Sequence, residues 1–122
     1  MSGRTILTVD DSRTMRNMLR MTLEDEGYRV LEAADGLLGL DVLKGEIPDV
    51  IVTDINMPNM DGFGFIEAVR AEARYDGVPI LVLTTESDRS LKDRARNSGA
   101  TGWITKPFEQ NRLIDVVRRV MA

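Results

Sequence analysis

Two patterns of apolar residues alternate along this chain, one typical of strands and the other of helices. Short apolar runs, several of them rich in β-branched residues, occupy residues 5–11, 28–36, 48–54, 78–86 and 101–105. Runs of this kind predict buried strands of a parallel sheet. Apolar residues at helical spacing occupy residues 12–27, 37–46, 63–77, 87–99 and the chain beyond 110. Five strands are therefore expected to alternate with five helices.

The helical segments differ in the apolar surface that they offer to a core. Residues at inward positions are Met15, Met18, Phe65, Ile66, Val69, Ala73, Leu113, Val116, Val117 and Val120, whereas Met21 lies off the apolar stripe. Either Asp11 or Ser12 can cap the first helix, and Gly27 can end it. Residues 88–98 contain a single large apolar side chain, Leu91. A segment with so little apolar burial is expected at the low-stability end of the domain.

The alternation of strands and helices predicts one α/β domain that spans residues 1–122. A parallel sheet of this kind is covered by helices on both faces. Neither an internal repeat nor a linker interrupts the pattern. Ligands of such sheets bind beyond the carboxyl ends of the strands, so candidate functional residues are expected there.

Composition excludes several kinds of chemistry. The chain has no cysteine and no histidine, which excludes disulfides, thiolate metal sites and a histidine base and leaves oxygen ligands for any metal. Its net charge is −4 and its pI is near 4.8, which argues against nonspecific nucleic-acid binding. Neither a signal peptide nor a membrane-spanning run is present, so a soluble, cytoplasmic protein is expected. No pattern in the sequence bears on its oligomeric state, and a monomer is the default expectation.

Polar side chains gather where the predicted strands end. Asp10 and Asp11 end the first strand, Asp54 the third, and Thr84 and Thr85 the fourth, and Lys106 follows the fifth. Three neighbouring carboxylates repel one another unless a cation lies among them, and Mg²⁺ is the natural candidate. The backbone carbonyl of Asn56 can turn toward the same ion. One oxygen of Asp54 would then remain free to act as a nucleophile.

Simpler interpretations exist for each of these residues alone. A single aspartate after a strand is usually a helix or turn cap, and Lys106 alone would be a solvated surface lysine. Asp10 can act through water, and Asp11 can cap or coordinate. A Mg²⁺-dependent phosphatase would share this chemistry but needs a substrate-covering cap, for which 122 residues leave no room. An FMN carrier would need a phosphate-cradling loop, whereas "DDSRT" places two carboxylates there.

Four motifs, "VDDS", "VTDINMPNMDG", "LTTES" and "WITKPF", occur in this order along the chain. Together they resemble the receiver domains of two-component response regulators, in particular the stand-alone, CheY-like chemotaxis regulators. The resemblance implies the flavodoxin/CheY-like strand order 2-1-3-4-5, for which CheY itself is a reference case. It also implies that Asp54 accepts a phosphoryl group from a histidine kinase. The other implied roles are Mg²⁺ binding by Asp10, Asp11, Asp54 and Asn56, phosphoryl binding by Thr84, and charge pairing by Lys106.

The resemblance further implies a conformational switch. Thr84 would move toward the phosphoryl group, and the aromatic residue at Trp103 would turn inward. Many family members carry Tyr or Phe at this position, and ordinary packing of Trp103 remains an alternative. Asn56 and Glu86 correspond to the positions that tune dephosphorylation. The bond between Lys106 and Pro107 corresponds to a cis peptide in the family.

The same resemblance implies what the domain would do in a cell. A CheA-like histidine kinase would phosphorylate it, and the new charge would change its docking surface for a flagellar motor switch protein. The alternative is a phosphate sink for a kinase, and a phosphatase is a further expected partner. The basic residues Arg89, Lys92, Arg94 and Arg96 would meet an acidic partner segment or form a solvated face. The domain would catalyse its own phosphoryl transfer and dephosphorylation without turning over an external substrate, and no output domain is expected.

Overall fold

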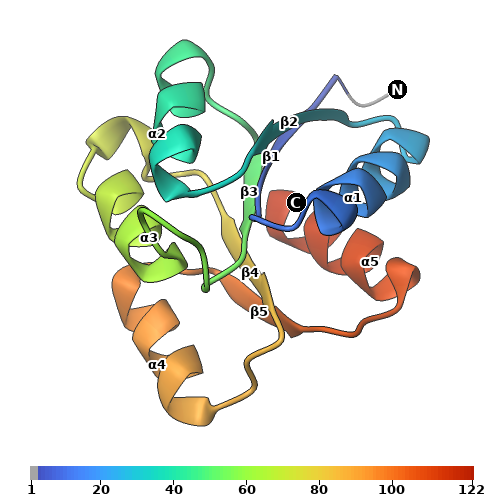
Figure 1. Ribbon diagram of the computed structural model, residues 1–122. Coiled ribbons are helices and arrows are strands. Elements are labelled where there is room, and N and C mark those ends of the chain that lie inside the picture. Colours follow the sequence, from blue (N-terminus) through green and yellow to red (C-terminus); the bar gives the residue numbers. More distant parts are fainter. Residues whose placement is uncertain (1–2) are drawn as a thin grey trace.

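The five apolar runs form one parallel sheet in a computed structural model that describes residues 3–122 (Figure 1). The strands are β1 (Thr5–Val9), β2 (Arg29–Ala33), β3 (Val50–Thr53), β4 (Ile80–Thr84) and β5 (Gly102–Thr105), in the order β2-β1-β3-β4-β5. Every residue of β1, β3 and β4 is buried. Burial on both faces explains why these strands are apolar at nearly every position instead of at alternate ones. The predicted fold class and strand order are confirmed.

Helices cover both faces of the sheet (Figure 1). On one face lie α1 (Arg13–Asp25) and α5 (Gln110–Met121), and on the other lie α2 (Gly36–Gly45), α3 (Gly62–Arg70) and α4 (Arg89–Ser98). Successive strand residues point to opposite faces, so Ile6 packs toward α1 and α5 while Leu7 packs toward the other three helices. The sheet is thus enclosed by two apolar cores.

The predicted helix over residues 63–77 is too long. The α-helix ends at Arg70, a short 3₁₀ turn follows at Ala73–Tyr75, and Ala73 is exposed instead of inward-facing. The buried Tyr75 hydroxyl donates to the Leu43 carbonyl at 3.1 Å, and the Arg70 guanidinium donates to the Tyr75 carbonyl at 2.9 Å. Arg70 also donates to the Gly99 carbonyl at 3.1 Å. The bonds to Leu43 and Gly99, which lie in other segments, favour the tighter turn, and helical spacing alone does not reveal them.

The ends and the exposed side of α1 agree with most expectations. Ser12, and not Asp11, caps the helix, because its hydroxyl accepts from the Met15 amide at 3.2 Å. Gly27 follows the end of α1 with a φ of 89°, a conformation that glycine adopts readily. Met21 is 66% exposed, as predicted. Met15 and Met18 are only half-buried at the border of the core.

Helix α4 buries fewer residues than the other helices. Ala95 is its one buried residue, and Leu91 is half-buried. This confirms the expectation of little apolar burial and places α4 among the segments that open most easily. Within residues 3–122, no helix combines the length and apolar character needed to cross a membrane.

Candidate functional site

The predicted site residues meet at the carboxyl edge of the sheet because the strands that carry them are neighbours. Val9 pairs with Thr53, and Asp10 and Asp54 directly follow these two residues. Likewise Thr84 pairs with Thr105, and Lys106 comes next in the chain. The register of three strand pairs therefore brings together side chains that are up to 96 residues apart in sequence.

Three carboxylates form the centre of this edge. Oxygens of Asp10, Asp11 and Asp54 lie within 4.8 Å of one another. Asp10 is buried, Asp54 is half-buried and Asp11 is exposed, so the cluster opens to solvent on one side. Hard oxygen donors at this spacing, with access for water, suit a divalent ion such as Mg²⁺. The donor set therefore fits the metal that the sequence predicts.

Lys106 binds two of these carboxylates. Its Nζ lies 2.9 Å from Asp10 Oδ2 and 3.2 Å from Asp54 Oδ2. Burial raises the pKa of Asp10, against the opposing effects of the hydrogen bonds from Lys106 and the Ser12 amide. Burial alone would lower the pKa of Lys106, but its bond to Asp10 and the charges of Asp10 and Asp54 together raise it. The ammonium is therefore fully charged at neutral pH and offsets the repulsion between the two carboxylates.

Both carboxylate oxygens of Asp54 accept hydrogen bonds at the carboxyl edge of the sheet. Oδ1 accepts from the Ile55 amide at 2.6 Å, and Oδ2 accepts from Lys106. Thr84, at the end of the neighbouring strand β4, is fully buried, and its backbone carbonyl accepts from the Lys106 amide at 2.7 Å. The bond between Lys106 and Pro107 is cis, as expected.

Two of the remaining predicted residues bridge the edge of the site. The Asn56 side-chain amide donates to Glu86 Oε1 at 3.2 Å, and the Glu86 amide donates to the Thr84 hydroxyl at 3.4 Å. The Trp103 indole donates to the Glu86 carbonyl at 3.1 Å and to the Thr105 hydroxyl at 3.3 Å. Trp103 thus packs against the core and also contacts the loop that reaches Asn56. Every predicted site residue belongs to this one region.

Gly62 lies where two backbone segments approach each other closely. Its amide donates to the Ile55 carbonyl at 2.8 Å, which closes the loop after Asp54. A Cβ at Gly62 would lie 2.3 Å from the Asp54 carbonyl oxygen and 2.8 Å from the Ile55 Cα. Backbone atoms fill the space, so glycine is required here by close approach of two segments and not by a left-handed conformation.

Gly62→Ala is expected to destabilise the protein by about 3 kcal/mol, since the new methyl meets backbone that cannot move without shifting Asp54. Chemical denaturation measures this loss. Gly45→Ala is the matched control, because no atom lies within 4 Å of a Cβ at that helical glycine. The control should be neutral or stabilising by up to about 1 kcal/mol. Equal stability of the two variants would contradict the close-approach explanation.

Three contacts near the site involve residues that the sequence did not single out. An Arg16 guanidinium nitrogen donates to the Asp10 backbone carbonyl at 2.6 Å. Asp35 caps α2 and also accepts from the Asn59 side chain at 2.8 Å. An aspartate followed by glycine before an apolar helix is a detectable cap signal for Asp35. Its bond to Asn59 has no such signal, because it joins two loops 24 residues apart.

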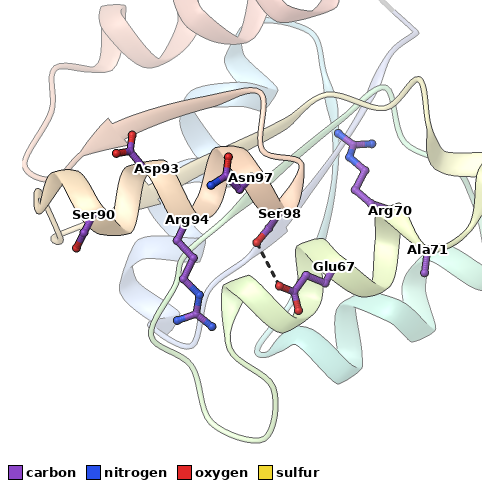
Figure 2. Close-up of a pocket in the computed structure, with 8 residues that line it drawn as sticks. All are labelled: Glu67, Arg70, Ala71, Ser90, Asp93, Arg94, Asn97 and Ser98. Carbon is purple, nitrogen blue, oxygen red and sulfur yellow. Dashed lines mark hydrogen bonds between the residues drawn. The ribbon is translucent and has the colours of Figure 1, made fainter.

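A concave surface also exists away from the strand ends. Figure 2 shows this open groove of about 720 Å³ between α3 and α4, where Ser98 donates to Glu67 at 3.3 Å. The Arg94 side chain extends from α4, with its guanidinium 4.0 Å from the centre of the Phe63 ring. None of the predicted site residues lines this groove. Chemistry, and not cavity size, therefore identifies the site.

Comparison with known proteins gives consistent matches. The family model described as "Response regulator receiver domain" matches residues 6–118. The chain is 42% identical over 105 residues to a chemotaxis protein CheY homolog of Campylobacter jejuni, covering 84% of this chain and 81% of the relative. It is 40% identical over 116 residues to the sensor histidine kinase CheAY of Helicobacter pylori, covering 93% of this chain but only 14% of that much longer protein.

Solved structures agree with the sequence matches. CheY4 of Vibrio cholerae superposes with a TM-score of 0.93 at 44% identity, covering 98% of this chain and 99% of the other. The receiver domain of the sensor histidine kinase PA1611 from Pseudomonas aeruginosa superposes with a TM-score of 0.90 at 27% identity, covering 98% of each chain. That second structure is described with a magnesium ion coordinated in its active-site cleft.

Proposed function

Because this chain belongs to the response regulator receiver domain family, we propose that it is a chemotaxis signalling switch that accepts a phosphoryl group on Asp54. Receiver domains of CheY-like regulators are phosphorylation-dependent signalling proteins, not enzymes that turn over an external substrate. The observation that carries the proposal is the position of the Lys106 ammonium between Asp10 and Asp54. It places a permanent cation beside the oxygen that would carry the new charge.

The proposed transfer breaks the bond between phosphorus and the kinase histidine nitrogen and forms one between phosphorus and an Asp54 oxygen. Receiver domains bind Mg²⁺ at their acidic site. In this chain Asp10, Asp11, Asp54 and the Asn56 carbonyl would hold the ion, which would neutralise negative charge on the transferring oxygens. Lys106 holds Asp54 Oδ2 in place and remains to pair with the phosphoryl group. Such positioning and charge stabilisation account for most of the catalysis that phosphoryl transfer needs.

The proposed switch runs from the phosphoryl group through Thr84 to Trp103. The Thr84 hydroxyl is buried, and within residues 3–122 its one hydrogen bond comes from the Glu86 amide at 3.4 Å, so it can reorient toward a phosphoryl group. The Trp103 indole is bound to the same loop through the Glu86 carbonyl. Movement of this loop would thus change the orientation of the Trp103 side chain and the position of the adjoining α4. Asn56 and Glu86 are proposed to tune dephosphorylation, since their side chains are hydrogen-bonded to each other where the site is exposed to water.

The proposed partners follow from the family and from the charge of the surface. A CheA-like histidine kinase would be the donor, and a flagellar motor switch protein would dock against the basic α4, with a phosphatase as a further partner. The alternative is a phosphate sink. We place the protein in the cytoplasm as a monomer that binds neither nucleic acid nor membrane, with residues 1–122 acting as one receiver domain. Binding of an acidic switch-protein segment by the phosphorylated form alone would distinguish docking from the sink.

Intact mass after incubation with a small acyl-phosphate donor tests the central proposal. A single phosphoryl adduct is expected in the presence of Mg²⁺, and chelation of the metal should reduce its formation by at least about 10-fold, because the single charge of Lys106 then has to offset three carboxylates that face the anionic donor. Addition of Mg²⁺ back to the same sample is the control. An adduct that forms equally well in chelator would contradict the proposed metal role.

A further inference from the structure

The loop that follows Asp54 is attached to a helix outside the site. We call residues 55–61 the acceptor loop. At its far end the Asn59 side-chain amide donates to Asp35 Oδ2 at 2.8 Å, and the Gly36 amide donates to the Met60 carbonyl at 3.2 Å. Asp35 and Gly36 form the start of α2, so two hydrogen bonds attach the acceptor loop to that helix.

Asp35 is suited to this attachment because it uses each carboxylate oxygen for a different partner. Oδ1 accepts from the Leu38 amide at 2.9 Å and caps α2, while Oδ2 accepts from Asn59. The residue is only 6% exposed. The bond from the Leu38 amide, followed by the bond from Asn59, holds the pKa of Asp35 below its ordinary value. Asp35 is therefore ionised at neutral pH and accepts both bonds in their stronger, charge-assisted form.

The backbone of the acceptor loop is adapted to the same contact. Asn59 has a φ of 67°, a left-handed conformation that asparagine tolerates better than most residues. A Cβ at Gly36 would lie 2.9 Å from the Met60 carbonyl oxygen, so only glycine allows the two segments to approach this closely. The bond from the Gly62 amide to the Ile55 carbonyl joins the two ends of the loop. Asn56 lies between these two fixed ends.

We infer that Asp35 and Asn59 are positioning residues, whose hydrogen bond fixes the acceptor loop and thereby the Asn56 carbonyl at the metal site. The inference rests on the proposed function for the role of Asn56, but the hydrogen bond itself does not. Residues that orient metal ligands without touching the metal commonly change its affinity by 10-fold or more. If the bond served stability alone, its loss would lower the melting temperature and leave Mg²⁺ affinity unchanged.

Two variants break the bond from opposite sides. Asp35→Asn keeps a good helix cap but has one acceptor oxygen where Asp35 uses two. Asn59→Gly removes the donor and retains access to the left-handed conformation. Asp41→Asn is the matched control, because it removes the same charge from an exposed position on the same helix.

Calorimetric titration with Mg²⁺ alone, together with hydrogen exchange of the Gly36 amide, provides the readouts. We expect each variant to lower Mg²⁺ affinity by about 3- to 10-fold and to increase exchange at Gly36. The double variant should match the single ones, since both remove the same bond. Asp41→Asn should match wild type in both readouts.

The two proposals fail in different ways. Unchanged Mg²⁺ affinity in both variants, alongside wild-type protein that binds Mg²⁺, would overturn the positioning role and leave the proposed function standing. Wild-type protein that binds no Mg²⁺ would instead overturn the metal part of the proposed function, and the positioning role with it. Affinities that fall additively in the double variant would show that the two residues act separately, which also contradicts the inference.

Discussion

Asp54→Asn should take up no phosphoryl group from a small acyl-phosphate donor or from a histidine kinase. The amide that replaces the carboxylate is a poor nucleophile, and among residues 3–122 no other carboxylate both pairs with Lys106 and reaches solvent. Asp10 contacts the same ammonium, but it is 2% exposed and lies deeper. Loss of a covalent nucleophile typically lowers the rate by on the order of 1,000-fold or more. Intact mass at matched times measures the loss.

The fold of this variant should survive. Asparagine retains an oxygen that can accept from the Ile55 amide, as Asp54 Oδ1 does at 2.6 Å, and it removes one of three mutually repelling carboxylates. Thermal unfolding of the metal-free protein should therefore occur at the wild-type temperature or above it. Asp41→Asn, an exposed substitution on α2, should be phosphorylated like wild type. An adduct on Asp54→Asn in wild-type yield would show that another residue is the acceptor.

The sheet was predictable because its three central strands, β1, β3 and β4, are buried on both faces, and such burial leaves a continuous apolar signal. The C-terminal end of α3 was not predictable in the same way. Helical spacing continues past Arg70, but the chain turns there because Arg70 donates to the Gly99 carbonyl and Tyr75 to the Leu43 carbonyl, both in other segments. The spacing of apolar residues predicts which side chains of a segment are buried. It does not predict hydrogen bonds to carbonyls of distant segments.

The contacts of the site likewise include some that the sequence predicts and some that it does not. Asp10, Asp54 and Lys106 follow predicted strands, so a parallel sheet brings them together and sequence order suffices to predict their meeting. The bond from Trp103 to the Glu86 carbonyl and the bond from Asn59 to Asp35 join loops and helix ends whose relative positions depend on packing. No periodicity encodes such pairs. They are also the contacts that fix the loops around the site, so the structure adds most where the switch is expected to act.

Lys106→Met should separate phosphoryl uptake from the conformational response. Methionine retains a linear side chain of similar length but lacks the charge, so Asp10 and Asp54 lose their shared partner. We expect the metal-free protein to lose about 2–3 kcal/mol of stability at neutral pH, less than for a fully enclosed ion pair because Asp54 reaches water. The raised pKa of Lys106 means that its stabilising effect is present below the ordinary lysine pKa and is lost only as the pH rises through the folded value. Wild type and variant should therefore converge only in strong alkali.

Mg²⁺ and Trp103 supply the decisive readouts for this variant. The metal should restore much of the lost stability, since a divalent cation can neutralise the same carboxylates, and phosphoryl uptake should continue at a reduced rate. The change in Trp103 emission on addition of a phosphoryl mimic should be absent, because the phosphoryl group no longer has the ammonium to draw it toward β5. Lys44→Met, at an exposed lysine of α2, should behave as wild type in every respect. A full emission response in Lys106→Met would mean that Thr84 alone couples the phosphoryl group to Trp103. The role of Lys106 would then be limited to holding two carboxylates together in the unphosphorylated protein.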